Sequence, residues 1–241
     1  MLNNYIPERA LFIYAHPDDI EFGVAGTAAK WAQAGAEVTY ILITDGNIGS
    51  HDPEMTPEKL AEIRRREQTE SAEVVGAKCV FLGYPDGRLV PDLGLRKDLT
   101  REIRRFKPNV VVCGDPTIVI SSSNRINHPD HRAAATAAID AVFPTADSPL
   151  IFPELVTEGF PPHKVNYVLL SYGRDADLYI DITATIDLKI EALRRHTSQI
   201  GDWDPSERLR DWSAEVGKKA GFAHAESYRL ITLNPLEAES E

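Results

Sequence analysis

Short apolar runs alternate along the chain with longer segments in which apolar residues recur every three or four positions. The first four runs lie at residues 11–15, 38–44, 79–84 and 109–115. Runs of this length and character are typical of strands buried on both faces of a parallel sheet. The segments between and after them predict helices near 24–34, 57–75, 95–106 and 130–142. The alternation therefore predicts a Rossmann-like α/β fold, with a mainly parallel sheet flanked by helices.

The segment 57–75 carries the best local helix signals. Thr56 can cap a helix, and Pro57 fits its first position, where a missing N–H group costs nothing. Gly76 follows the segment and suits the left-handed conformation that often ends a helix.

The pattern becomes less regular after residue 143, where prolines are more frequent. Two further strands are expected at 164–172 and 177–183, and a last helix at 184–198. We interpret this part as an irregular C-terminal portion that completes the same domain. Residues 1–241 are therefore expected to form one domain.

Composition and charge narrow the function classes. The chain has 241 residues, 43% of them apolar, which is enough for a large core. It has 26 basic and 37 acidic residues, a net charge of −11. This balance argues against binding to nucleic acid and to anionic membranes, so a small-molecule partner is expected.

Cysteine usage and hydropathy indicate a cytoplasmic protein. Cys79 and Cys113 lie in strand-like runs without a neighbouring cysteine, which argues against a disulfide framework or a cysteine zinc site. We find neither a signal-peptide pattern nor a segment with the roughly 20 apolar residues that span a membrane.

The run at 11–15 is followed by a polar turn, His16-Pro17-Asp18-Asp19. Ligands bind at the carboxyl ends of strands in open α/β sheets, and this turn comes directly after a predicted strand. The His16 imidazole and the Asp19 carboxylate can bind one cation, and this ligand mixture suits zinc. Asp18 would then leave a free carboxylate beside the metal. The alternative is an ordinary polar turn in which an Asp caps the next helix.

A second histidine motif, INHPDHRAA, lies at 126–134. Pro129 fits the first turn of a helix, so His128 is expected as its N-cap and His131 in the same turn. One imidazole could bind a metal while the other stabilises negative charge on a substrate, as in hydrolytic sites. Taken alone, the pair could also be two solvated histidines. Together the two motifs favour a metal-dependent enzyme.

Seven segments in this order resemble the zinc-dependent N-deacetylases of the PIG-L/LmbE family: AHPDDIEFG, VTYILITDGNIGS, IRRREQTESAEVVGA, FLGYPDGRL, INHPDHRAA, HTSQ and AESYRL. Members act on N-acetylglucosamine-containing and related N-acyl sugar conjugates. The resemblance implies His16, Asp19 and His131 as Zn²⁺ ligands and Asp18 as general base. It implies that His128 stabilises the oxyanion, acting protonated, or serves as an acid. A trimer or hexamer is also expected from the family.

Further residues are candidates for substrate binding. The resemblance marks Arg64, His196 and Glu226, although Arg64 could instead lie on a solvated helix face and His196 at a helix end. Asp45 follows the second strand and could contact sugar hydroxyls or only form a turn. Trp203 could stack on a sugar or serve in packing.

For Asp86, in GYPDGR, the turn interpretation is favoured over a role in the site.

Two other functions are compatible with parts of this pattern. Gly23 and Gly26 follow the first strand, as in dinucleotide-binding proteins, but the G-x-G-x-x-G spacing is absent and the turn's carboxylates would repel phosphate. A non-catalytic sugar-binding or regulatory protein could keep the same fold and metal site. It could lose Asp18, however, so the presence of Asp18 favours catalysis.

Overall fold

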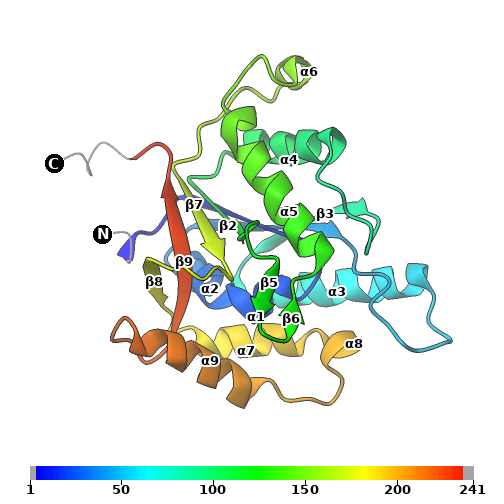
Figure 1. Cartoon of the computed structure of the whole chain (residues 1–241), viewed down its shortest axis with the longest axis vertical. Helices are drawn as coiled ribbons and strands as arrows, with labels where there is room; N and C mark the ends of the chain where they lie inside the picture. The colour runs from blue at the N-terminus through cyan, green and yellow to red at the C-terminus, as the bar shows by residue number, and fades with distance from the viewer. Residues whose placement is uncertain (1–3, 236–241) are drawn as a thin grey trace.

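The structure is a computed structural model that describes residues 4–235. Seven of its strands form one sheet: β1 (Arg9–Tyr14), β2 (Glu37–Thr44), β3 (Lys78–Tyr84), β4 (Val110–Gly114), β7 (Tyr167–Ser171), β8 (Leu178–Asp181) and β9 (Ala225–Thr232). Their order is β3-β2-β1-β4-β7-β9-β8. Figure 1 shows β9 between β7 and β8. The first five are mutually parallel, and β9 is antiparallel to both neighbours. The predicted fold class, a mainly parallel α/β sheet, is confirmed.

Helices cover both faces of this sheet (Figure 1). One face packs against α1 (Asp19–Gly23), α2 (Ala25–Gln33), α3 (Pro57–Val75), α7 (Ile186–Arg194) and α9 (Ser206–Lys218). The other packs against α4 (Leu93–Phe106) and α5 (Pro129–Asp140). The side chains of β1 alternate between the two cores, with Phe12 in the first and Ile13 in the second. Burial on both faces explains why the central strands are continuously apolar.

The helix predicted at 57–75 has the expected ends. The Thr56 side chain accepts a hydrogen bond from Lys59, Pro57 occupies the first turn, and Gly76 adopts a left-handed conformation with φ 82°. The helix expected near 24–34 is observed as α2, and a short helix that was not predicted, α1, precedes it and is separated from it by Val24. The helix expected at 130–142 ends as α5 at Asp140 and continues as a π-helical segment, η2 (Ala141–Ala146).

The C-terminal part differs most from expectation. The helix predicted at 184–198 is divided into α7 and α8 (Thr197–Ile200), because His196 leaves helical geometry with ψ 53°. Neither α9 nor β9 was predicted. Glu226 and Arg229 interrupt the apolar pattern of β9, so the strand depends on pairing with β7 and β8. A hairpin of β5 (Ile120–Ser122) and β6 (Arg125–Ile126) and a short helix, α6 (Pro153–Thr157), complete the elements.

Cys79 and Cys113 are free thiols, as expected. Across residues 4–235, every helix is too short or too polar to cross a membrane. The cytoplasmic location, the single domain and the trimer or hexamer stay predictions.

Candidate metal centre and active site

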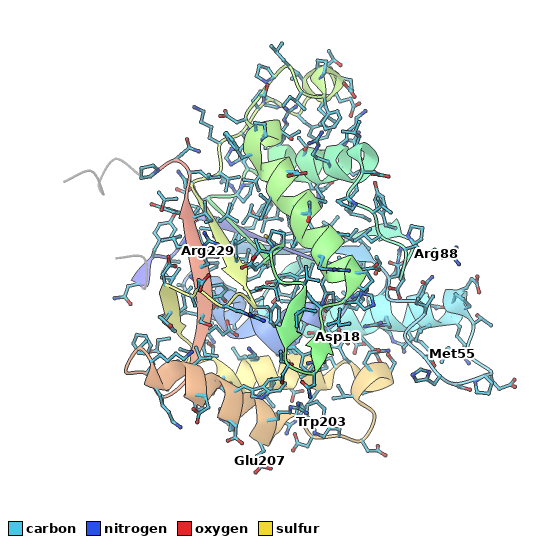
Figure 2. All side chains as sticks on the ribbon, in the orientation of Figure 1. Asp18, Met55, Arg88, Trp203, Glu207 and Arg229 are labelled. Atoms are coloured by element: carbon cyan, nitrogen blue, oxygen red, sulfur yellow. The ribbon has the colours of Figure 1, made fainter. Side chains whose placement is uncertain are left out.

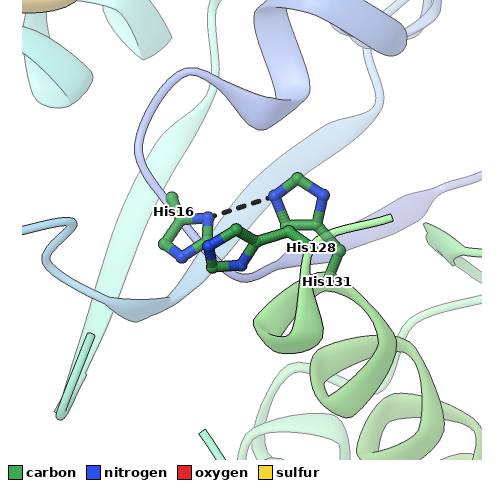
Figure 3. A group of neighbouring side chains, drawn as sticks. All are labelled: His16, His128 and His131. Atoms are coloured by element: carbon green, nitrogen blue, oxygen red, sulfur yellow. Dashed lines mark hydrogen bonds between the residues drawn. The ribbon is translucent and has the colours of Figure 1, made fainter. Parts of the chain in front are cut away.

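The two histidine motifs meet at the carboxyl edge of the sheet. His16 follows β1, Asp19 begins α1, and His131 lies in the first turn of α5. Parallel pairing of β1 with β4 brings the segments that follow these strands together. His16 Nδ1 lies 3.1 Å from His131 Nε2 (Figure 3), and Asp19 carboxylate oxygens lie 3.0 Å from His131 Nε2 and 3.5 Å from His16 Nδ1.

These distances fit a bound cation. Atoms that bind one tetrahedral zinc at about 2.0–2.1 Å lie roughly 3.3 Å from each other. The two imidazole nitrogens and the Asp19 oxygens are separated by 3.0–3.5 Å, close to that value. His16, Asp19 and His131 are therefore arranged so that they could hold one small divalent ion.

The far side of the His16 ring faces two buried carboxylates. His16 Nε2 lies 3.0 Å from Asp86 Oδ1 and 3.4 Å from Asp130 Oδ2. Burial alone would lower the pKa of His16, but hydrogen bonds to Asp130, Asp19 and Asp86 outweigh it and raise the pKa to about 12. A proton held on Nε2 by these carboxylates leaves Nδ1 as the nitrogen that can bind a metal.

Asp86 and Asp130 are themselves fixed by backbone hydrogen bonds. Asp86 accepts from the N–H of Ile48 at 3.0 Å, and Asp130 from those of Gly87 at 2.7 Å and Leu89 at 3.2 Å. The turn interpretation of Asp86 was incomplete, since its carboxylate supports His16. Asp130 was not singled out at all, although its position between the two histidines of HPDH was the available signal.

Asp18 lies beside the three candidate ligands without joining them. Its backbone is left-handed, with φ 88°, and its side chain is 17% exposed. Burial raises the pKa of Asp18 to about 6, against the opposing charge of Arg64, whose Nη2 lies 3.2 Å from Oδ2. Asp18 is also close enough to contribute to the raised pKa of His131. A carboxylate with this pKa can exchange protons near neutral pH.

Arg64 is buried and joins two loops at the edge of the sheet. Its guanidinium donates to the carbonyls of Gly46 at 2.7 Å and Pro17 at 2.6 Å. At Gly46 a Cβ atom would lie 2.2 Å from Arg64 Nη1, so this close approach requires glycine. The solvated helix-face interpretation fits its neighbour Arg65, which forms a two-point ion pair with Asp45 at 2.8 Å.

His128 is the N-cap of α5, as expected, and its Nδ1 accepts a hydrogen bond from the Asp130 N–H. Its ring centre lies 4.9 Å from that of His16 and 5.2 Å from that of His131. Burial and the two neighbouring histidines lower the pKa of His128. Because Nδ1 accepts a hydrogen bond, Nε2–H is the donor of this ring, and a protonated His128 stays a prediction. His128 is also near enough to His16 and His131 to contact a shared ion.

A cavity of about 740 Å³ opens beside these groups. Asp19, His128, His131 and Trp203 are among the residues that line it. Trp203 is 40% exposed, and its ring is nearly parallel to that of Phe22. Figure 2 shows Trp203 at the end of the molecule where α9 lies. The volume is within the range of roughly 300–1,000 Å³ that is typical of small-molecule sites.

Glu226 lies in the interior, not on the cavity wall. Its carboxylate accepts from the N–H groups of Gly26 at 3.0 Å and Thr27 at 2.8 Å, and it pairs with Lys189 at 2.6 Å. It therefore occupies the helix N-terminus where a dinucleotide-binding protein would hold pyrophosphate, which argues further against that function.

His196 is also fully buried, with its Nε2 3.4 Å from Glu21 Oε2. Like Glu226, it is absent from the wall of the cavity described above.

Comparison with known proteins places these residues in a family. The model of the PIG-L family, described as GlcNAc-PI de-N-acetylase, matches residues 11–142. The chain is 32% identical to diacetylchitobiose deacetylase of Thermococcus kodakarensis, over 93% of this chain and 83% of that protein. It is 26% identical to a probable N-acetyl-α-D-glucosaminyl L-malate deacetylase of Bacillus anthracis, over 79% and 81%.

Solved structures agree on the fold. N,N′-diacetylchitobiose deacetylase from Pyrococcus horikoshii superposes with a TM-score of 0.86 at 32% identity, over 96% of this chain and 88% of that one. The 4-carboxy-2-hydroxymuconate hydratase GalB of Pseudomonas putida superposes with a TM-score of 0.79 at 21% identity, over 95% and 98%. The second likeness shows the fold alone, because one fold can host different reactions. On the family match and the similarity over nearly its whole length, the chain belongs to the PIG-L family of GlcNAc-PI de-N-acetylases.

Proposed function

We propose that this chain is a metal-dependent hydrolase that removes the N-acetyl group from a small glucosamine-type sugar or sugar conjugate. One observation carries the proposal: His16, Asp19 and His131 converge beside a cavity that Asp19, His128 and His131 line, and the Asp18 carboxylate is close enough to raise the pKa of His131. Relatives named as deacetylases of N-acetylglucosamine compounds support the choice of bond.

We propose Zn²⁺ as the ion, held by His16, Asp19 and His131. Two imidazole nitrogens with one carboxylate form a ligand set that zinc favours and that leaves a position open. When bound, zinc polarises a carbonyl group and lowers the pKa of water to about 7.

The chain's own groups then move the proton and stabilise charge. Asp18 accepts a proton from the water that adds to the acetamide carbon, and delivers it to the amine nitrogen as the C–N bond breaks. The His128 Nε2–H donates a hydrogen bond to the carbonyl oxygen as it becomes negative, a contribution of about 3 kcal/mol in comparable sites. The products are acetate and a free amine.

For substrate binding we propose that Trp203 packs against the sugar. Arg64 acts in this proposal by holding the loops after β1 and β2, since its guanidinium bonds to their carbonyl groups. We assign no substrate contact to Asp45, His196 or Glu226. Their carboxylate or imidazole groups face other parts of the protein.

The decisive experiment measures acetate release from N-acetylglucosamine, diacetylchitobiose and an N-acetylglucosaminyl malate. Wild-type protein loaded with Zn²⁺ is compared with Asp18→Asn at equal metal content. Release by the wild type alone supports the proposal and ranks the substrates. Binding of these sugars without any release, by either protein, would instead support the non-catalytic sugar-binding alternative.

A further inference from the structure

Helix α3 buries a stripe of polar side chains on one face. Arg64, Glu67, Gln68 and Ser71 follow helical spacing, and all four are buried. A buried helix face is normally apolar, and buried polar groups are costly unless they are hydrogen-bonded. The hydrogen-bond partners of Arg64, Gln68 and Ser71 therefore indicate the function of this polar stripe.

The side chain of Gln68 contacts the backbone of Asp18, the candidate general base. Its Oε1 accepts a hydrogen bond from the Asp18 N–H at 3.0 Å, and its Nε2 donates to Glu21 Oε1 at 2.8 Å. Ser71 Oγ donates to the same Glu21 oxygen at 2.8 Å. A carboxylate accepts hydrogen bonds and does not donate them, so Glu21 fixes the amide of Gln68 with its oxygen toward Asp18.

Helix α3 thereby holds both polar groups of a single peptide unit. The Pro17 carbonyl accepts from Arg64 Nη2 at 2.6 Å, and the Asp18 N–H of the same unit donates to Gln68. Asp18 adopts φ 88°, a conformation that is uncommon for residues other than glycine and that persists where surrounding contacts impose it. Rotation of this peptide unit would change the direction of the Asp18 side chain.

We propose that Gln68 is a positioning residue that holds the peptide unit between Pro17 and Asp18, and so keeps the Asp18 carboxylate beside the metal ligands. The inference rests on the proposed function, in which Asp18 is the general base. Gln68 contacts neither substrate nor metal in this role and acts only through Asp18.

The test is a double-mutant cycle with Gln68→Met and Asp18→Asn. Gln68→Met keeps the side-chain length but removes the acceptor, so kcat is expected to fall tenfold to a hundredfold, with unchanged KM and metal content. In the Asp18→Asn background the same change is expected to cost less than about twofold. An equal loss in both backgrounds would overturn the proposal, because a merely structural role does not depend on Asp18.

The experiment includes a control variant and a replacement variant. Thr100→Val is the matched control, since Thr100 is a buried polar residue of α4 whose hydroxyl donates to the Arg96 carbonyl of its own helix, and kcat is expected to stay unchanged. Gln68→Asn, whose amide is one methylene too short to span Asp18 and Glu21, replaces Gln68→Met if the latter does not fold.

Amide hydrogen exchange separates this proposal from the proposed function. If the wild type releases no acetate from any sugar, the proposed function fails, but exchange at the Asp18 N–H still reports on Gln68. Gln68→Met is expected to speed that exchange at least tenfold while leaving amides in β2 unchanged. Equal exchange in both proteins would overturn the role of Gln68 whatever the activity.

Discussion

His16 Nδ1 and His131 Nε2 lie 3.1 Å apart, although 115 residues separate them in the chain. Two imidazole nitrogens at this distance must share a proton or a cation. The Asp86 and Asp130 carboxylates keep a proton on the other nitrogen of His16, which favours the cation at Nδ1. This relationship leads to the first two predictions.

Removing a ligand should remove the metal. His131→Ala and Asp19→Ala are each expected to lose the bound divalent ion during dialysis, because two remaining ligands bind zinc weakly. Elemental analysis of the dialysed proteins measures this. His51→Ala, at an exposed loop histidine, is the control and should retain the metal. Full metal retention by both ligand variants would contradict the site.

Weakening the support of His16 should lower metal affinity without abolishing binding. Asp86→Asn keeps an oxygen for the Ile48 N–H but removes the charge that faces His16 Nε2. Affinity is expected to fall about 10- to 100-fold, as for other carboxylates behind a metal-binding histidine. Competition with a chelator measures the change. Asp98→Asn, at a partly exposed carboxylate of α4, should leave affinity unchanged.

The ionised carboxylate of Asp18 should lower the free energy of unfolding of the metal-free protein above neutral pH. Burial raises the pKa of Asp18 from 3.8 to about 6, so its charged form is disfavoured in the folded state. Metal-free Asp18→Asn is therefore expected to be more stable than wild type by ~3 kcal/mol at about pH 8.

The difference should shrink as the pH falls through 6 and vanish below about pH 3, where the carboxyl is protonated in folded and unfolded protein alike. Urea unfolding at several pH values measures it. A constant difference across this range would contradict the raised pKa.

The interior pair of Lys189 and Glu226 should matter for stability and not for substrate binding. Lys189→Met leaves the Glu226 carboxylate buried without its cation, which is expected to cost about 3 kcal/mol. Adding Glu226→Gln should recover part of that loss. Urea unfolding measures stability, and KM for the best substrate should stay constant. A variant with a raised KM and normal stability would instead indicate that Glu226 contacts the substrate.

The sequence by itself determined the class of fold and the chemistry of the two histidine motifs. Continuous apolar runs predict doubly buried strands, and Thr56, Pro57 and Gly76 predict the ends of α3, because these signals act within a few residues. His16 and Asp19 could be proposed as ligands from residue type and local spacing, whereas the choice of His131 over His128 rested on the family resemblance.

Only the tertiary structure decided which distant groups meet. The roles of Asp130 and Gln68, the inward direction of Arg64 and the place of β9 between β7 and β8 depend on strand order and helix docking. Local periodicity does not encode those contacts, since a buried polar side chain and a solvated one look alike in sequence. Their partners become visible when the sheet brings the loops after β1, β2 and β3 to one edge.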